Sequence, residues 1–97
     1  MRSFQLTPEA SRDMERIADD LANFSGLPSS DQFLSGITKA ISRLTRFPHL
    51  GYQRDDLSPG IRSLIYKKYL ILYRVNGESL EILRIVQGSQ NLENLFP

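Results

Sequence analysis

The alternation of hydrophobic and polar residues along the first quarter of the chain predicts a short strand followed by a helix. Positions 3–6 alternate polar and apolar side chains, which is typical of a strand. Thr7 is a suitable helix N-cap, and Pro8 and Glu9 favour a first helical turn. Gly26 and Pro28 are expected to end this helix. Its apolar positions recur at helical spacing and are Ala10, Met14, Ile17, Ala18, Leu21 and Ala22.

A second helix is predicted to begin at Ser29, with Gln32 three residues later in the S-x-x-Q form of a capping box. Pro48 is expected to end it. Because the turn between the two helices is so short, they should lie antiparallel as a hairpin. Residues 49–60 read as a polar loop. The predicted buried stripe of the second helix is Phe33, Ile37, Ala40, Ile41, Leu44 and Phe47.

The second half of the chain predicts three strands, at 61–66, 69–75 and 79–86. Asn76-Gly77 between the last two is a strong signal for a two-residue hairpin turn. That turn would place Tyr73 opposite Leu80. A last helical turn is expected through Leu92 and Leu95. The chain should therefore be a single α+β domain over 1–97: N-terminal strand, antiparallel helix hairpin, three-stranded antiparallel meander and short C-terminal helical turn.

This register gives the predicted meander two apolar faces. The helix hairpin should cover the face that contains Ile71 and Tyr73. An exposed apolar patch on the other face would indicate a partner protein. The alternative is that the C-terminal segment folds back over that face. The residues predicted to bind a partner there are Leu70, Leu72, Arg74, Leu83 and Ile85.

Composition narrows the class of protein. The 97 residues include no cysteine, which excludes disulfides and thiolate chemistry. The N-terminus lacks the apolar run of a signal peptide, and no stretch approaches the roughly 20 apolar residues of a membrane helix. We therefore expect a cytoplasmic protein that does not bind membranes. Net charge is +1, but residues 1–31 sum to −3 and residues 61–86 to +3, a division that favours charged partners.

Few side chains suggest catalysis. His49 is the single histidine and lies in the predicted loop, and the tyrosines of the strands are best explained by packing. No metal-binding or phosphate-binding motif is present, so we expect no cofactor, no metal and no catalytic residue. Arg84 interrupts an apolar strand and should pair with a carboxylate of the first helix, Asp13 or Glu9.

The order of these elements and several short segments resemble the RelE/ParE superfamily of toxins from type II toxin–antitoxin systems. The opening segment 4–10 and the helix-to-loop junction at 47–51 are similar to those of ParE proteins. The segments of the three strands, at 60–64, 69–75 and 82–86, are similar as well. The resemblance covers nearly the whole chain and implies the same α+β fold.

The resemblance also separates two activities. RelE-like ribonucleases, which cut messenger RNA in the ribosome, would carry an arginine early in the middle strand, an arginine after the glycine and a tyrosine near the chain end. This chain has Leu70, Gln90 and Phe96 at those positions. The resemblance therefore implies the ParE branch, whose members poison DNA gyrase by binding and are not enzymes. The alternatives are a ribosome-dependent ribonuclease with a reworked site, or a degenerate, non-toxic family member.

For the ParE branch, the resemblance implies a cognate, ParD-like antitoxin as partner in a hetero-oligomer. Contact with DNA would be only indirect, through that antitoxin. Gyrase or another topoisomerase would be the target. The residues implied in target binding are Arg62, Arg84, Gln87 and Gln90. For Arg84 the competing interpretation is the internal ion pair.

Overall fold

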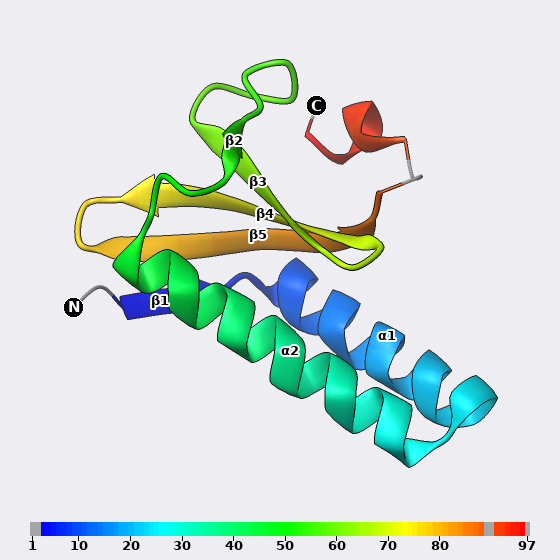
Figure 1. Cartoon of the computed structure of the whole chain (residues 1–97). Helices are drawn as coiled ribbons and strands as arrows, with labels where there is room; N and C mark the ends of the chain where they lie inside the picture. The colour runs from blue at the N-terminus through cyan, green and yellow to red at the C-terminus, as the bar shows by residue number, and fades with distance from the viewer. Residues whose placement is uncertain (1–2, 89–90, 97) are drawn as a thin grey trace.

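In the computed structural model, which describes residues 3–88 and 91–96, a helix hairpin covers one face of a five-stranded sheet (Figure 1). The strand order is β1-β5-β4-β3-β2. β1 is parallel to β5, and the other neighbours are antiparallel. The predicted α+β class is confirmed. The elements are β1 (Ser3–Leu6), α1 (Pro8–Ser25), α2 (Leu27–Arg46), β2 (Tyr52–Gln53), β3 (Ile61–Tyr66), β4 (Tyr69–Asn76), β5 (Ser79–Gln87) and the 3₁₀ helix η1 (Leu92–Leu95).

The start of α1 is as predicted, whereas the start of α2 is not. The Thr7 hydroxyl accepts a hydrogen bond from the Ala10 amide at 3.0 Å, and Pro8 is the first helical residue. Gly26, at φ +96°, is at once the C-cap of α1 and the N-cap of α2. A glycine in this conformation reverses the chain within one residue, so α2 begins at Leu27 and no capping box forms at Ser29.

The buried stripe of α2 is confirmed except at its last member. Phe47 lies beyond the helix, as its C-cap residue with an extended φ of −131°, and its side chain is 58% exposed. The helical periodicity no longer applies at that position, which explains the error. The confirmed members are Phe33, Ile37, Ala40, Ile41 and Leu44.

The β4–β5 hairpin differs from its predicted register. Asn76 pairs with Ser79 and Tyr73 pairs with Ile82, so the loop residues are Gly77 and Glu78. Gly77, at φ +62°, occupies the first loop position. The predicted pairing of Tyr73 with Leu80 is therefore wrong, because the Asn-Gly pair does not span the loop.

A bulge at Leu83 changes the direction of the side chains that follow it. Tyr73 pairs with Ile82 and Leu72 with Arg84, which leaves Leu83 as an extra residue on β5. Ile85 consequently lies in the core beneath the helices, fully buried, and not on the opposite face as predicted. Val86 takes the opposite face instead.

Two hydrophobic clusters result, one on each side of the sheet. On the side of the helices, which we call the helix face, α1 and α2 pack on Tyr69, Ile71, Tyr73, Leu80, Ile82 and Ile85. On the other side, the second face, Ile61, Leu72 and Val86 are buried under Leu57 and Leu92. Figure 1 shows η1 on this second side, away from the helices. The alternative prediction, that the C-terminal segment folds over this face, is confirmed.

Candidate functional site

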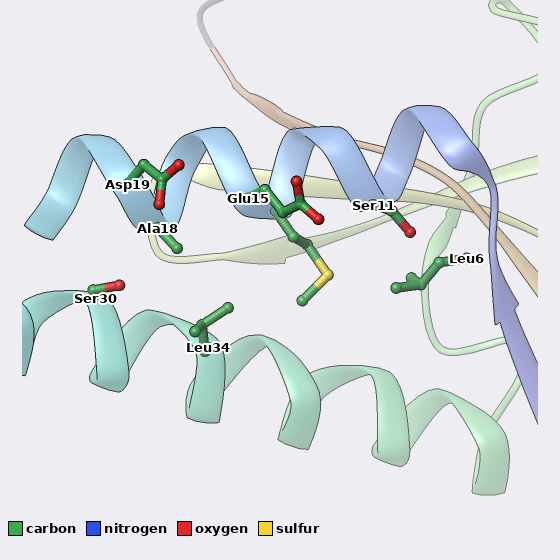
Figure 2. Close-up of a pocket in the computed structure, with 8 residues that line it drawn as sticks. Leu6, Ser11, Glu15, Ala18, Asp19, Ser30 and Leu34 are labelled. Carbon is green, nitrogen blue, oxygen red and sulfur yellow. The ribbon is translucent and has the colours of Figure 1, made fainter.

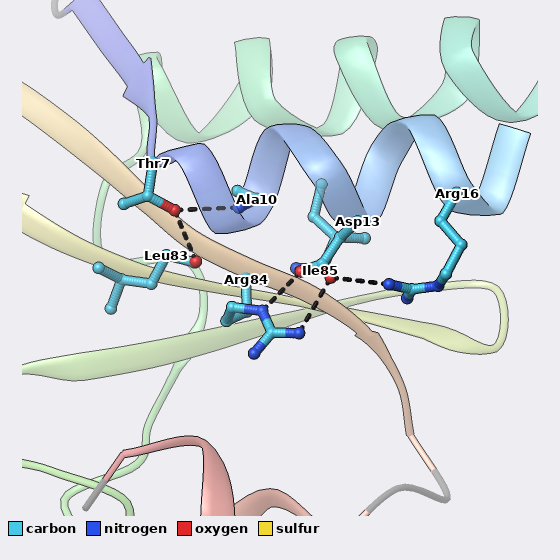
Figure 3. Close-up of polar contacts among 7 residues, drawn as sticks. All are labelled: Thr7, Ala10, Asp13, Arg16, Leu83, Arg84 and Ile85. Carbon is cyan, nitrogen blue, oxygen red and sulfur yellow. Dashed lines mark hydrogen bonds and ion pairs between the residues drawn. The ribbon is translucent and has the colours of Figure 1, made fainter.

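The side chain of Asp13 joins α1 to β5 (Figure 3). Its carboxylate accepts hydrogen bonds from Arg84 Nε at 2.7 Å, from the second nitrogen of the Arg84 fork at 3.0 Å and from the Ile85 amide at 3.0 Å. Arg16 approaches the same carboxylate at 3.3 Å. Asp13 lies outside the apolar stripe of α1, yet its side chain is only 2% exposed. The clue in the sequence was Arg84, a cation in an apolar strand.

The charge of Asp13 is stabilised by these donors. Burial alone would raise the pKa of Asp13, but the hydrogen bonds from Arg84 and Ile85 and the positive charge of Arg84 together lower it. The same contact raises the pKa of Arg84. The predicted pairing of Arg84 with the first helix is thus confirmed, with Asp13 as the partner. Arg84 holds α1 against the edge of β5, and its role toward a target stays a prediction.

Thr7 and Asp13 also continue the edge of the sheet where β1 stops. The last residue pair of β1 and β5 is Leu6 with Ile82. Beyond it, the Thr7 amide donates to Ile82 O at 3.0 Å and the Thr7 hydroxyl donates to Leu83 O at 2.8 Å. Asp13 then takes the Ile85 amide. The side chains of Thr7 and Asp13 therefore form hydrogen bonds with backbone groups of β5 that a longer β1 would have bound (Figure 3).

A second junction holds the loop after α2 against the sheet. The buried Tyr73 hydroxyl donates to Pro48 O at 2.8 Å and accepts from the Gly51 amide at 2.9 Å. Arg62 donates to Gly51 O at 2.8 Å and to His49 O at 3.3 Å. A Cβ on Gly51 would lie 2.7 Å from Ser63 O and from the Tyr73 ring, so only glycine fits. Burial raises the pKa of Tyr73, which keeps its hydroxyl a donor.

Of the five residues predicted to bind a partner on the second face, two are fully buried and three stay partly accessible. Leu72 and Ile85 are fully buried, the latter on the helix face. Leu70 and Leu83 are half-buried and pack around the cluster that Leu92 helps to close. Arg74 is 40% exposed and lies 4.0 Å from Glu81. The predicted open apolar face is therefore wrong, because the chain covers its centre with its own C-terminal segment.

The remaining predicted positions lie apart from these junctions. Gln87 is exposed at the end of β5, and Gln90 lies outside the described residues. Phe96 packs against the second-face cluster. Within the described ranges, no group of three or more acidic, histidine or cysteine residues could hold a metal ion. None of the helices described is long and apolar enough to cross a membrane.

A helix hairpin on one face of this sheet, with a short C-terminal helix on the other, defines a toxin domain of the RelE/ParE class. The family model described as "ParE toxin of type II toxin-antitoxin system, parDE" matches residues 4–92. The chain belongs to this ParE toxin family.

Two relatives agree with this assignment. The chain is 40% identical over 86 residues to Toxin ParE3 of Caulobacter vibrioides, an alignment that covers 89% of this chain and 86% of that protein. It is also similar to the solved structure titled "Chromosomal ParDE TA system from P. aeruginosa". That match has a TM-score of 0.77 at 26% identity and covers 90% of this chain and 96% of the other. As a ParE-type toxin, the chain is expected to have an antitoxin partner.

Proposed function

We propose that this ParE-type toxin stops growth by binding DNA gyrase or a related topoisomerase, and that a ParD-like antitoxin neutralises it in a hetero-oligomer. The toxin would act in the cytoplasm and would meet DNA only through the antitoxin or the target complex. Gln87 is exposed and could contact the target, whereas Arg62 and Arg84 would do so only with the part of each side chain that their internal hydrogen bonds leave accessible. The family assignment supports the proposal, and the placement of the cations supports binding over catalysis.

The observation that favours binding over RNA cleavage is that the two strand arginines form hydrogen bonds within the protein. Arg84 forms two hydrogen bonds with Asp13, and Arg62 donates to two backbone carbonyls. Cleavage of RNA needs a base for the 2′-hydroxyl, an acid for the leaving oxygen and cations for the phosphate. Leu70 and Phe96, at two positions where a RelE-like enzyme has catalytic groups, are half-buried hydrophobic side chains of the second-face cluster. This arrangement supports a toxin that acts by binding.

We propose that the antitoxin contacts the accessible rim of the second face, at Leu70, Leu83 and Arg74. Leu70 and Leu83 pack against the second-face cluster, and Arg74 pairs in the sheet with Ile61, a member of that cluster. Leu72 and Ile85, which the sequence suggested for the same role, are fully buried and would act only as support.

Induced expression without antitoxin tests the proposed target. If gyrase is bound, labelled thymidine incorporation should fall before uridine or amino-acid incorporation, and the purified protein should inhibit gyrase supercoiling in vitro. Cleavage of messenger RNA on purified ribosomes, lost in a folded Arg62→Ala variant, would instead establish the ribonuclease alternative. Normal growth with full expression of folded protein would identify a degenerate, non-toxic member.

A further inference from the structure

The solvent-facing side of α2 carries a row of three cations, which we call the basic ridge. Lys39, Arg43 and Arg46 recur at i, i+4 and i+7, which places them on one face of the helix, opposite its buried stripe. All three side chains are exposed, and none forms an ion pair with another described residue. From the first to the last of them, the ridge spans about 10 Å along the helix axis.

Acidic residues are missing from this part of the sequence. No aspartate or glutamate occurs between Asp31 and Asp55, and the uncharged polar residues exposed beside the ridge include Gln32, Ser35 and Ser42. A helix face that is only solvated usually mixes both signs, with acids three or four residues from the cations. The ridge therefore carries an uncompensated positive charge, although the net charge of the whole chain is only +1.

The turn between β3 and β4 adds a fourth cation to this surface. Gly36 of α2 lies against Tyr66 of β3, so closely that a Cβ on the glycine would overlap the tyrosine hydroxyl. This contact places the turn beside the helix, and Lys67 and Lys39 line one hollow of about 520 Å³. Among the described residues that line this hollow, only Asp31 is acidic. Lys67 therefore extends the basic surface beyond α2.

The groove between the two helices is acidic, in contrast to the ridge. Glu15 and Asp19 line it, and Figure 2 shows both carboxylates on its α1 side. None of the ridge residues lines this groove. A polyanion is attracted to the ridge and repelled from the groove, so the charges of the hairpin turn the solvent-facing side of α2 toward it.

We infer that the basic ridge binds the phosphate backbone of the duplex DNA held by the target topoisomerase. The inference rests on the proposed function and deepens it, because it adds a contact between the toxin and the DNA of the target complex. Duplex DNA presents one negative charge per about 1.7 Å of its axis, so a straight row of cations meets several phosphates at once.

The side chains of this surface favour a duplex over a single strand. Lysine, arginine and short hydroxyl side chains are common ligands of phosphate oxygens, and such contacts carry no sequence information. Proteins that hold single strands stack the bases on aromatic side chains, but no exposed residue of α2 is aromatic. The ridge would therefore hold any DNA sequence on which the enzyme is bound.

Salt-dependent binding to DNA tests the inference. The probe is a short fluorescein-labelled DNA duplex of mixed sequence, and its affinity for the toxin is measured by fluorescence anisotropy between about 50 and 200 mM salt. With three ridge cations and Lys67, the slope of log affinity against log salt concentration should be about −3 to −4. A second duplex of unrelated sequence should bind equally well. Lys39→Gln/Arg43→Gln should reduce the steepness of the slope by about two and weaken binding about tenfold or more at about 50 mM salt.

A pair of cations on α1 provides the matched control. Arg12 and Arg16 are exposed and also lie four residues apart, but they line a hollow together with Glu9 and Asp13. Arg12→Gln/Arg16→Gln changes net charge by the same amount as the ridge variant and should alter affinity less than about threefold. Arg46→Gln, a milder change on the ridge, should reduce the steepness of the slope by about one. Circular dichroism checks that each variant is folded.

The outcomes separate this inference from the proposed function, which inhibition of gyrase supercoiling tests by itself. If wild-type toxin inhibits gyrase but does not bind the duplex, or if the ridge variant and the control bind it alike, the inference is wrong and the proposed function stands. Tighter binding to double-stranded RNA of the same sequence would overturn the assignment to DNA. If the ridge variant binds DNA normally but no longer binds gyrase, the ridge contacts an acidic surface of the target protein instead. If wild-type toxin binds DNA through the ridge and inhibits no topoisomerase, the proposed function falls.

Discussion

Replacement of Arg84 by alanine should destabilise the protein because it removes the partner of a buried carboxylate. Asp13 is 2% exposed and would keep only the Ile85 amide and the more exposed Arg16, at 3.3 Å, as donors. Breaking a buried ion pair costs about 3–5 kcal/mol. Because the Arg84 side chain is 23% exposed, water can replace part of its contact, and we expect a loss of about 2–3 kcal/mol.

The effect should depend on pH in a defined direction. In the wild type the pKa of Asp13 is lowered, so its contribution to stability is complete above about pH 4 and is lost as pH falls through the lower folded pKa. In Arg84→Ala, burial is no longer outweighed, and the pKa of Asp13 should rise above its ordinary value. The variant then relieves its buried charge by protonation. The stability difference between the two proteins should therefore shrink from pH 7 to pH 4.

Urea unfolding followed by circular dichroism at both pH values measures this difference. Arg16→Ala is the matched control, because Arg16 contacts the same carboxylate at 3.3 Å from a side chain that is 56% exposed. Its loss should cost less than about 1 kcal/mol. If Arg84→Ala costs no more than Arg16→Ala, the Asp13–Arg84 pair does not stabilise the fold. If its effect is the same at both pH values, the loss does not arise from the buried charge of Asp13.

Five further substitutions test the packing and the second face. Ile41→Ala, at a fully buried site, should lower the free energy of unfolding in urea by about 2–5 kcal/mol. Phe47→Ala should change it by less than about 0.5 kcal/mol. Equal losses would mean that α2 does not end before Phe47. Tyr73→Phe should lower stability by about 1–3 kcal/mol, since Pro48 O and the Gly51 amide lose their partner. An unchanged midpoint of urea unfolding would show that these hydrogen bonds do not stabilise the loop after α2. Leu72→Asp should unfold the domain, whereas Leu83→Asp should leave it folded and weaken antitoxin binding about tenfold in calorimetry. Unchanged affinity in Leu83→Asp would remove the second face from the antitoxin interface.

Local signals in the sequence were sufficient for the elements of the fold. Thr7 and Pro8 mark the start of α1 because capping involves neighbours in sequence. The stripe of α2 is readable because one face of a helix recurs every three or four residues. The strands follow from their apolar composition. The internal pairing of Arg84 was also predictable, because a buried cation needs a carboxylate and the first helix supplies several.

Long-range geometry was the part that the sequence did not reveal. The alternation of residues 79–87 is interrupted at Ile82-Leu83, where two apolar residues are adjacent. Adjacent apolar residues also fit a regular strand that is buried on both faces, so this interruption did not identify the bulge that moves Ile85 to the helix face. Asp13 looks like a surface residue because the helical periodicity shows only that it is polar. It does not show that Arg84 lies beside it in the fold. The openness of the second face depended on where the C-terminal segment folds, and Leu92 and Leu95 fit either a free tail or a cover. For these reasons Leu72 and Ile85 were expected to be accessible to an antitoxin although both are fully buried.

The contacts that replace β1 beside β5, where the chain passes from β1 into α1, limit how a partner can bind this toxin. An unpaired strand edge is a template for another chain, and β1 protects β5 only as far as Ile82. The Thr7 hydroxyl donates to Leu83 O and the Asp13 carboxylate accepts from the Ile85 amide, at the bulge and directly after it. This stretch of β5 therefore offers no backbone ladder for an added strand. A partner that docks on this stretch of β5 must instead use side-chain surfaces.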